Sequence, residues 1–392
     1  MLLPSFSLAS LLLATGASAA PLASLVVRDN ATTTAPAYEA SRLNITYQSN
    51  YTEGLPKTLI MATGGTIAGS SASSTDSTNY RAGQIGVAAL VEAVPELLNV
   101  SNIYGMQVAN VGSPSVTDDI VLEIAKLANL ALCSENAEFD GVVVTHGTDT
   151  LEETAFTLDI TLTCDKPIVV VGAMRPASAI SADGPNNLIS AVSVAVTPSS
   201  RGRGVLVVLN DRICQAWYCA KRHANALDTF ASPEQGFVGY LLSIKPFYYY
   251  PASQPSYKKV YDVSAVESLP RVDMFIAYQG VSWDTMNASI ANGAKGFVTA
   301  GVGSGGYSGE AGAAVASAIE QGMVVVRSTK INNGAVVPSP RADTISAGLL
   351  NPVKARRMLQ ILLALGKTQE EIKAEFEADF EADLSLDLTE YY

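Results

Sequence analysis

The sequence predicts an α/β protein of two domains, a larger N-terminal domain with a mostly parallel sheet flanked by helices and a smaller C-terminal α/β domain. Short β-branched runs alternate with helical patterns from residue 58 onward, which is typical of parallel sheets covered on both faces. The length of 392 residues and a hydrophobic content of 48% leave room for two domains of ordinary size.

The strands and helices of the larger domain follow from these runs. Buried strands are expected where apolar, β-branched residues stand between polar turns, at residues 58–63, 141–145, 168–171 and 204–209. A helix is expected over residues 117–132, because apolar residues recur there at helical spacing. Thr117 is placed to cap this helix, with Asp118 and Asp119 in its first turn.

The alternation stops at IKPFYYYPASQPSYKKVYDVS, a stretch rich in proline, tyrosine and serine. We interpret residues 244–269 as a linker between an N-terminal catalytic domain, residues 56–243, and a C-terminal domain, residues 270–380. In the second domain we expect strands at 273–278, 296–300 and 323–327 and helices at about 309–321 and 351–365. Residues 381–392 are an acidic tail.

The first residues have the pattern of an export signal. An apolar stretch followed by Ala17-Ser18-Ala19 predicts a signal peptide at residues 1–19. Residues 20–55 are interpreted as an exposed, glycosylated lead-in without a fold of its own. N-glycosylation motifs, which agree with export, begin at Asn30, Asn44, Asn50, Asn99 and Asn287. The predicted location is therefore secreted, either extracellular or in the cell wall or periplasmic space.

Charge excludes two classes of partner. A formal net charge of -12 opposes nucleic-acid phosphates and anionic lipid surfaces. Beyond the signal peptide, no stretch is long and apolar enough to predict a membrane span. We therefore expect no nucleic-acid or membrane partner.

Two strand ends open onto glycine-rich turns that carry threonine. The first is ATGGTIAGS, residues 62–70, and the second is VVVTHGTDTLEET, residues 142–154. Taken singly, each is explained by a tight turn or a helix cap. The functional alternative is a hydroxyl nucleophile at the carboxyl end of a parallel strand, where open α/β sheets bind ligands.

These two motifs together resemble the double signature of the bacterial-type L-asparaginase family. Further motifs stand in the family's order: NYRAGQIG, GSPSVTDD, VGAMRPASAISADGPNN and RGVLVVLND. The signal peptide and cysteines resemble the secreted type II branch, as in an exported, glycosylated fungal member. The resemblance implies an asparaginase-like fold and hydrolysis of L-asparagine to L-aspartate and ammonia by acyl transfer. It also implies no cofactor and a homotetramer.

The resemblance also assigns roles to individual residues. Thr66 would be the nucleophile, on a flexible, exposed loop that closes over the substrate, with Tyr80 as its partner in proton transfer. Thr148, Asp149 and Lys221 would form a second group, in which the lysine acts as base. Which threonine attacks first is left open.

The lysine is placed by its distance from the LND strand end. Arg222 is excluded as base because its guanidinium stays protonated. For Lys221 the alternative is a solvated surface cation. Ser113 and Asp149 would hold the substrate's α-carboxylate and α-ammonium.

The chain departs from the family at three positions. Pro114 replaces a glutamine or glutamate that contacts the ammonium in many relatives, and proline offers no side-chain acceptor. Gly280 and Arg341 stand approximately where the family has polar residues that complete a neighbouring subunit's site. Two alternatives therefore stay open: a mixed asparaginase and glutaminase, and a catalytically weak amino-acid-binding protein.

Cysteine number fits disulfides better than a metal site. The chain has four cysteines, only two histidines and no C-x-x-C motif, so we expect no metal. Cys133 and Cys164 bracket the second motif, and the type II branch has a disulfide at this place. We expect a second bridge between Cys214 and Cys219, with a free pair as the alternative.

Two polar residues near the motifs have structural interpretations. His146 is expected to support its loop through a hydrogen bond rather than act as a base. Asp183 is expected to cap or pin the helix that follows it.

Overall fold

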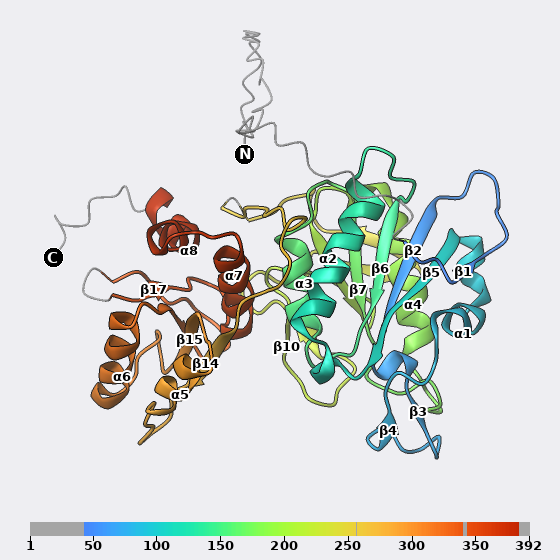
Figure 1. Ribbon diagram of the computed structural model, residues 1–392. Helices are drawn as coiled ribbons and strands as arrows, with labels where there is room; N and C mark the ends of the chain where they lie inside the picture. The colour runs from blue at the N-terminus through green and yellow to red at the C-terminus, as the bar shows by residue number, and fades with distance from the viewer. Residues whose placement is uncertain (1–42, 256, 340–342, 384–392) are drawn as a thin grey trace, which may run out of the picture. The chain divides into compact units, whose positions relative to one another are not determined.

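The computed structural model describes residues 43–255, 257–339 and 343–383, which form the predicted two-domain α/β architecture (Figure 1). All of them belong to one compact unit. Across these described stretches, no helix combines the length and apolar character needed to cross a bilayer. The predicted signal peptide at residues 1–19, Asn30, Arg341 and residues 384–392 of the predicted acidic tail lie outside the described residues.

The larger domain contains, within the described chain, a nine-stranded sheet with a parallel centre. Its spatial order is β1 (Tyr47–Gln48), β5 (Asn102–Val111), β2 (Lys57–Gly64), β6 (Gly141–Thr145), β7 (Ile168–Val171), β8 (Val205–Leu209), β9 (Arg212–Gln215), β12 (Gly239–Leu242) and β13 (Lys245–Tyr248). Strands β5, β2, β6, β7 and β8 run parallel. Their carboxyl ends therefore meet along one edge of the sheet.

Helices cover both faces of this sheet. One face packs against α2 (Asp118–Cys133) and α3 (Leu151–Asp159), the other against α1 (Val87–Glu92) and α4 (Gly184–Val196). Leu59 of β2 lies in the first core and Ile60 in the second, because successive side chains of a strand point to opposite faces. The predicted cap of α2 is confirmed, since the Thr117 hydroxyl accepts from the Ile120 N–H at 3.3 Å.

The smaller domain is a parallel sheet of β14 (Val272–Ile276), β15 (Gly296–Gly301), β16 (Val324–Thr329) and β17 (Ile345–Ser346). Helices α5 (Thr285–Ala291) and α6 (Gly309–Glu320) share a core with Phe297 on one face. Helix α7 (Pro352–Ala364) packs with Val298 on the other, and α8 (Gln369–Asp383) contacts β17. The same apolar cluster continues from α7 to α3 of the larger domain.

Three of the predicted segment limits are wrong. The acidic tail was expected from residue 381, but helix α8 continues to Asp383. The linker was expected from residue 244, but residues 245–248 form β13, which pairs antiparallel with β12 at the sheet edge. An edge strand tolerates Pro246, because proline cannot donate a hydrogen bond to a further strand. The lead-in was expected to lack structure, but β1 pairs with β5, and the Thr52 N–H donates to Asn102 Oδ1 at 2.7 Å.

A disulfide joins Cys133 and Cys164, as predicted, with their Cα atoms 5.4 Å apart. Cys133 is the last residue of α2. Cys164 lies beyond the end of α3, in the turn before β7. The bridge therefore joins the last residue of α2 to the connection between α3 and β7.

Removing this bridge is expected to lower the free energy of unfolding. The loop that it closes spans 31 residues, and the chain-entropy model gives about 3 to 4 kcal/mol for a loop of this size, as an upper value. Denaturant unfolding of the Cys133→Ser/Cys164→Ser variant measures the loss. Parent protein unfolded with reductant should match the variant, and equal stability of the variant and the oxidised parent would contradict the expectation.

The second predicted bridge is wrong, because Cys214 and Cys219 are free thiols. Both are fully buried, and their side chains share a hydrogen bond. The Cys214 Sγ also lies 2.9 Å from the Ser232 hydroxyl. The two thiols are buried and hydrogen-bonded, so they pack as ordinary core side chains.

Candidate active site

Paired glycines turn the chain sharply at the end of β2. Gly64 has φ +103° and Gly65 φ +79°, a left-handed region that residues with a Cβ rarely adopt. Neither position has space for a side chain. A Cβ on Gly64 would lie 2.6 Å from the Val111 carbonyl oxygen, and one on Gly65 only 2.3 Å from the Gly147 nitrogen.

Three loops thereby meet backbone to backbone at neighbouring strand ends. Gly65 follows β2 and touches Gly147, which follows β6. A Cβ on Gly147 would lie 2.8 Å from the Ser113 Cβ, in the loop that follows β5. The glycines of both threonine motifs are therefore needed to bring Ser113, Thr66 and Thr148 to one edge of the sheet.

Thr66 is hydrogen-bonded to Tyr80, the partner predicted from the sequence. Thr66 opens a short 3-10 turn, Thr66–Ala68, and Tyr80 lies on the hairpin of β3 (Ser70–Ser71) and β4 (Tyr80–Arg81). The Thr66 Oγ1 and Tyr80 Oη atoms are 2.6 Å apart. Thr66 was expected to be exposed, but it is only 5% accessible, because Ile67 and Ala68 of the same turn belong to the core.

Lys221 connects to both polar residues of the second motif. It lies on a hairpin of β10 (Ala220–Lys221) and β11 (Phe230–Ala231). Its Nζ donates to Thr148 Oγ1 at 2.9 Å and to Asp149 Oδ1 at 2.7 Å. The Lys221 side chain is 14% exposed, so the solvated-cation alternative does not describe it.

Ser113 lies beside this group, as predicted. Its hydroxyl accepts from the Asp149 N–H at 3.2 Å, and its carbonyl oxygen accepts from the Thr150 hydroxyl at 2.9 Å. Thr150 was not among the site residues predicted from the sequence. The second threonine of TDT was the available signal, since it stands at the same strand end as the first.

His146 and Asp183 are structural, as expected. The fully buried His146 ring contacts the Gly147 carbonyl oxygen through Nδ1 at 2.8 Å and Thr154 Oγ1 through Nε2 at 3.0 Å. Asp183 accepts from the backbone N–H groups of Met174 and Arg175, both at 2.9 Å, and so pins the loop before α4. With both ring nitrogens occupied, His146 supports its loop.

Burial of His146 makes stability depend on pH. Its pKa is lowered from 6.5 to about 4, chiefly because burial disfavours the charged ring. Between these values the unfolded chain binds a proton that the folded chain does not, so stability rises with pH in this window. We expect this group to make the free energy of unfolding about 2 kcal/mol lower at about pH 5 than above pH 7.

Denaturant unfolding at both pH values measures the effect, with His146→Gln as the comparison. The variant loses the titrating ring and should show a flatter pH dependence, whatever its absolute stability. A variant with the same pH dependence as the parent would contradict the role of His146.

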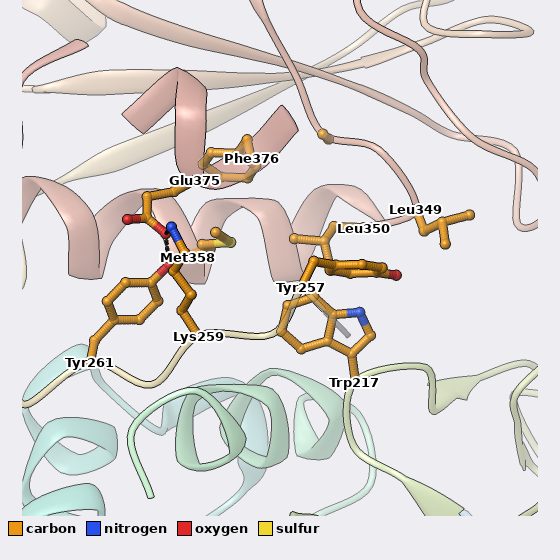
Figure 2. A pocket seen from close by; sticks show the side chains of 10 residues that line it. Trp217, Tyr257, Lys259, Tyr261, Leu349, Leu350, Met358, Glu375 and Phe376 are labelled. Carbon is orange, nitrogen blue, oxygen red and sulfur yellow. Dashed lines mark hydrogen bonds and ion pairs between the residues drawn. The ribbon is translucent and has the colours of Figure 1, made fainter. Parts of the chain in front are cut away.

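Gly280, one of the departures from the family pattern, contacts none of the site residues in the hydrogen bonds of the described chain. Gly280 is exposed at φ +74°, and the left-handed turn accounts for glycine at this position. Figure 2 shows a cavity lined by Trp217, Tyr257, Tyr261 and residues of α7 and α8, but by none of the predicted site residues. In the part of the chain that the structure describes, no cluster of three or more His, Cys, Asp or Glu could hold a metal ion.

Comparison with known families agrees with this geometry. Residues 57–254 match the family model "Asparaginase, N-terminal", and residues 271–376 match "Glutaminase/Asparaginase C-terminal domain". The chain belongs to the asparaginase family. It is 46% identical to L-asparaginase 2 of Bacillus subtilis over 82% of this chain and 85% of that protein. It is 43% identical to probable L-asparaginase 4 of Schizosaccharomyces pombe, over 82% and 90%.

A solved structure of the asparaginase family shares the fold. The crystal structure of a probable cytoplasmic L-asparaginase from Campylobacter jejuni matches with a TM-score of 0.77 at 39% identity. The match covers 82% of this chain and 99% of that one. This likeness agrees with the assignment of the chain to the asparaginase family.

Proposed function

We propose that this chain hydrolyses the side-chain amide of L-asparagine to L-aspartate and ammonia, with Thr66 as the nucleophile. One observation carries the proposal. At adjoining strand ends, each of two threonine hydroxyls is hydrogen-bonded to a group that can exchange a proton with it, Thr66 with Tyr80 and Thr148 with Lys221. A neutral hydroxyl is a weak nucleophile, so such a partner is what acyl transfer to threonine requires.

In the first half-reaction, the Thr66 oxygen attacks the amide carbon and its proton passes to Tyr80 Oη, 2.6 Å away, as Tyr80 gives its own hydroxyl proton to the amide nitrogen. The tetrahedral intermediate collapses with cleavage of the carbon–nitrogen bond. Ammonia leaves with the proton given by Tyr80, whose hydroxyl is restored by the Thr66 proton, and aspartate remains as an ester on Thr66.

In the second half-reaction, water attacks this ester and releases aspartate. Thr148 and Lys221, whose Oγ1 and Nζ atoms are 2.9 Å apart, would take up the water proton, with Lys221 as the base, and return it to the Thr66 oxygen. Asp149, 2.7 Å from the same Nζ, stabilises the ammonium form that arises.

The α-groups of the substrate are assigned to Ser113 and Asp149. The Ser113 hydroxyl accepts from a backbone N–H, so its own hydrogen can turn toward a carboxylate. Asp149 has a 64% exposed side chain and offers an acceptor to an ammonium group. Pro114, next to Ser113, adds no acceptor, which weakens the ammonium contact.

Ammonia release by purified protein tests the function, with asparagine and glutamine as parallel substrates. We expect asparagine to be hydrolysed faster. Comparable rates would instead favour the mixed asparaginase and glutaminase. Binding of asparagine without ammonia release would contradict the proposal and favour an amino-acid-binding protein.

We also propose that the chain is exported and glycosylated. Three features support this: the signal-like residues 1–19, the Cys133–Cys164 disulfide, and exposure of the sequon residues Asn44, Asn50, Asn99 and Asn287. N-terminal sequencing and an endoglycosidase mobility shift on the secreted protein test it. Protein retained in the cell with Met1 intact and no shift would contradict it.

Assembly into a homotetramer is also proposed. In its support, Met274, Ile276 and Tyr278 are exposed along one side of the edge strand β14 and its extension, an arrangement typical of protein interfaces. Light scattering on deglycosylated protein should give a tetramer. A fully active monomer would contradict this assembly.

A further inference from the structure

A lysine from the smaller domain ends inside the turn that precedes Lys221. Lys354, in the first turn of α7, is only 2% exposed. Its Nζ donates to three backbone carbonyl oxygens, those of Ala216 and Trp217 at 2.9 Å and of Cys219 at 2.6 Å. An ammonium group has three donors, so this turn occupies all of them.

The turn leads directly into the strand that carries the catalytic amine. It joins β9 to β10, and Lys221 is the second residue of β10. Trp217, at the centre of the turn, packs against Phe156 and Tyr257, with ring centroids 5.3 and 5.9 Å apart. Figure 2 shows Trp217 directed toward Tyr257 and Leu350. Lys354 thus binds the carbonyl oxygens of the turn, while the Trp217 side chain of the same turn packs against aromatic rings.

Glu152 ties Lys221 to the same helix by a second route. The Glu152 carboxylate accepts from the Lys221 backbone N–H and, at 3.1 Å, from Asn351 Nδ2. Asn351 in turn caps α7, because its Oδ1 accepts from the Lys354 N–H at 3.0 Å. Glu152 belongs to α3, in the same motif as Asp149. This one residue of the second motif therefore contacts both α7, through Asn351, and the strand that carries Lys221.

Burying the charged side chains of Lys354 and Glu152 costs free energy, and this cost favours a fixed arrangement of the groups that pair with them. Burial lowers the pKa of Lys354 and raises that of Glu152, and the attraction between the two groups opposes both shifts. A buried ammonium is costly unless all its donors are paired. The turn therefore cannot move away from Lys354 without leaving that charge unpaired, and Lys221 moves with the turn.

We propose that Lys354 and Asn351 are positioning residues, through which the smaller domain holds the Lys221 amine in register with Thr148 and Asp149 of the same chain. This inference rests on the proposed function. Neither residue touches the reacting group; both act through the backbone around Lys221. We call the contacts through which Lys354 and Asn351 hold the backbone around Lys221 the clamp. A displacement of about 1 Å can cost about 10²-fold in rate, so loosening the clamp should lower kcat more than it changes KM.

The variant Lys354→Met tests the clamp, with Arg356→Met as its matched control. Arg356 lies on the same helix and also reaches the larger domain, with Nη2 3.4 Å from Asp118 Oδ2, but it has no contact with the turn in the structure. We expect Lys354→Met to lower kcat by at least about 10-fold with KM within about 3-fold, while Arg356→Met keeps kcat within about 3-fold. Equal kcat losses in the two variants, or none in Lys354→Met, would overturn the proposal.

A second variant separates positioning from folding. Serine caps helices about as well as asparagine, so Asn351→Ser should leave the melting temperature near that of the parent while removing the donor to Glu152. We expect a lowered kcat at unchanged melting temperature. This variant decides the matter if Lys354→Met does not fold, and parent-like kcat in it would overturn the role of Asn351.

Chemical labelling tests the clamp independently of turnover. Acylation of Lys221 by a small anhydride, followed by peptide mapping, reports how firmly its amine is held. Lys221 should be labelled faster in Lys354→Met than in the parent or Arg356→Met, and equal rates would overturn the proposal. If the parent protein releases no ammonia from asparagine, the proposed function fails, while the labelling result still decides the clamp.

Discussion

Replacing Thr66 with alanine is expected to reduce asparagine hydrolysis by at least about 10³-fold, because the variant lacks the oxygen that forms the ester. The fold should survive. Thr66 is buried, but the substitution removes only a hydroxyl and a methyl group and one hydrogen bond, that to Tyr80. Loss of such a bond costs about 1 kcal/mol. Ammonia release and thermal unfolding measure the two effects separately.

Thr66→Ser is the matched control, because it keeps the hydroxyl beside Tyr80. It should retain much more activity than the alanine variant. Turnover near the parent rate in Thr66→Ala would refute the nucleophile assignment, and an equal loss in both variants would indicate a packing effect.

Replacing Lys221 with methionine is expected to lower kcat by at least about 10²-fold, the usual contribution of a general base. Methionine keeps most of the side-chain length, but Thr148 and Asp149 lose their shared partner. Arg222→Met is the control, since the neighbouring Arg222 side chain is exposed and bonds to Asn333 Oδ1 at 3.0 Å instead. Its activity should stay close to that of the parent.

The pair of variants distinguishes the two candidate cations directly. An active Lys221→Met protein, or an Arg222→Met protein that is equally impaired, would contradict the placement of the base.

The sequence was most informative for the central strands. The strands predicted at 141–145 and 168–171 coincide with β6 and β7. Parallel strands that are buried on both faces have uninterrupted runs of apolar residues, which are easy to recognise in a sequence. β13 was missed because its proline and tyrosines are typical of irregular chain as well as of an edge strand. β1 was missed for a related reason, since a two-residue strand has no periodicity.

The site was predictable to the extent that its chemistry lies in local motifs. Thr66, Tyr80, Ser113, Thr148 and Asp149 all stand in such motifs. The structure brings all of them but Tyr80 to neighbouring strand ends, and Tyr80 reaches Thr66 from the hairpin of β3 and β4. Lys221 was placed only by its distance from the LND strand end.

Lys354 had no comparable signal, because its partners stand 135 to 138 residues away in the sequence. The one local indication is its spacing. Lys354 stands four residues before Met358 and so lies on the apolar stripe of α7, where a charge needs a buried partner.

Acid quenching during turnover, followed by peptide mapping, tests the central claim most directly. Parent protein mixed with asparagine and quenched in acid should carry an aspartyl ester on the tryptic peptide of residues 58–81, at Thr66. An ester on the peptide that contains Thr148, or on neither peptide while asparagine is being consumed, would contradict the account.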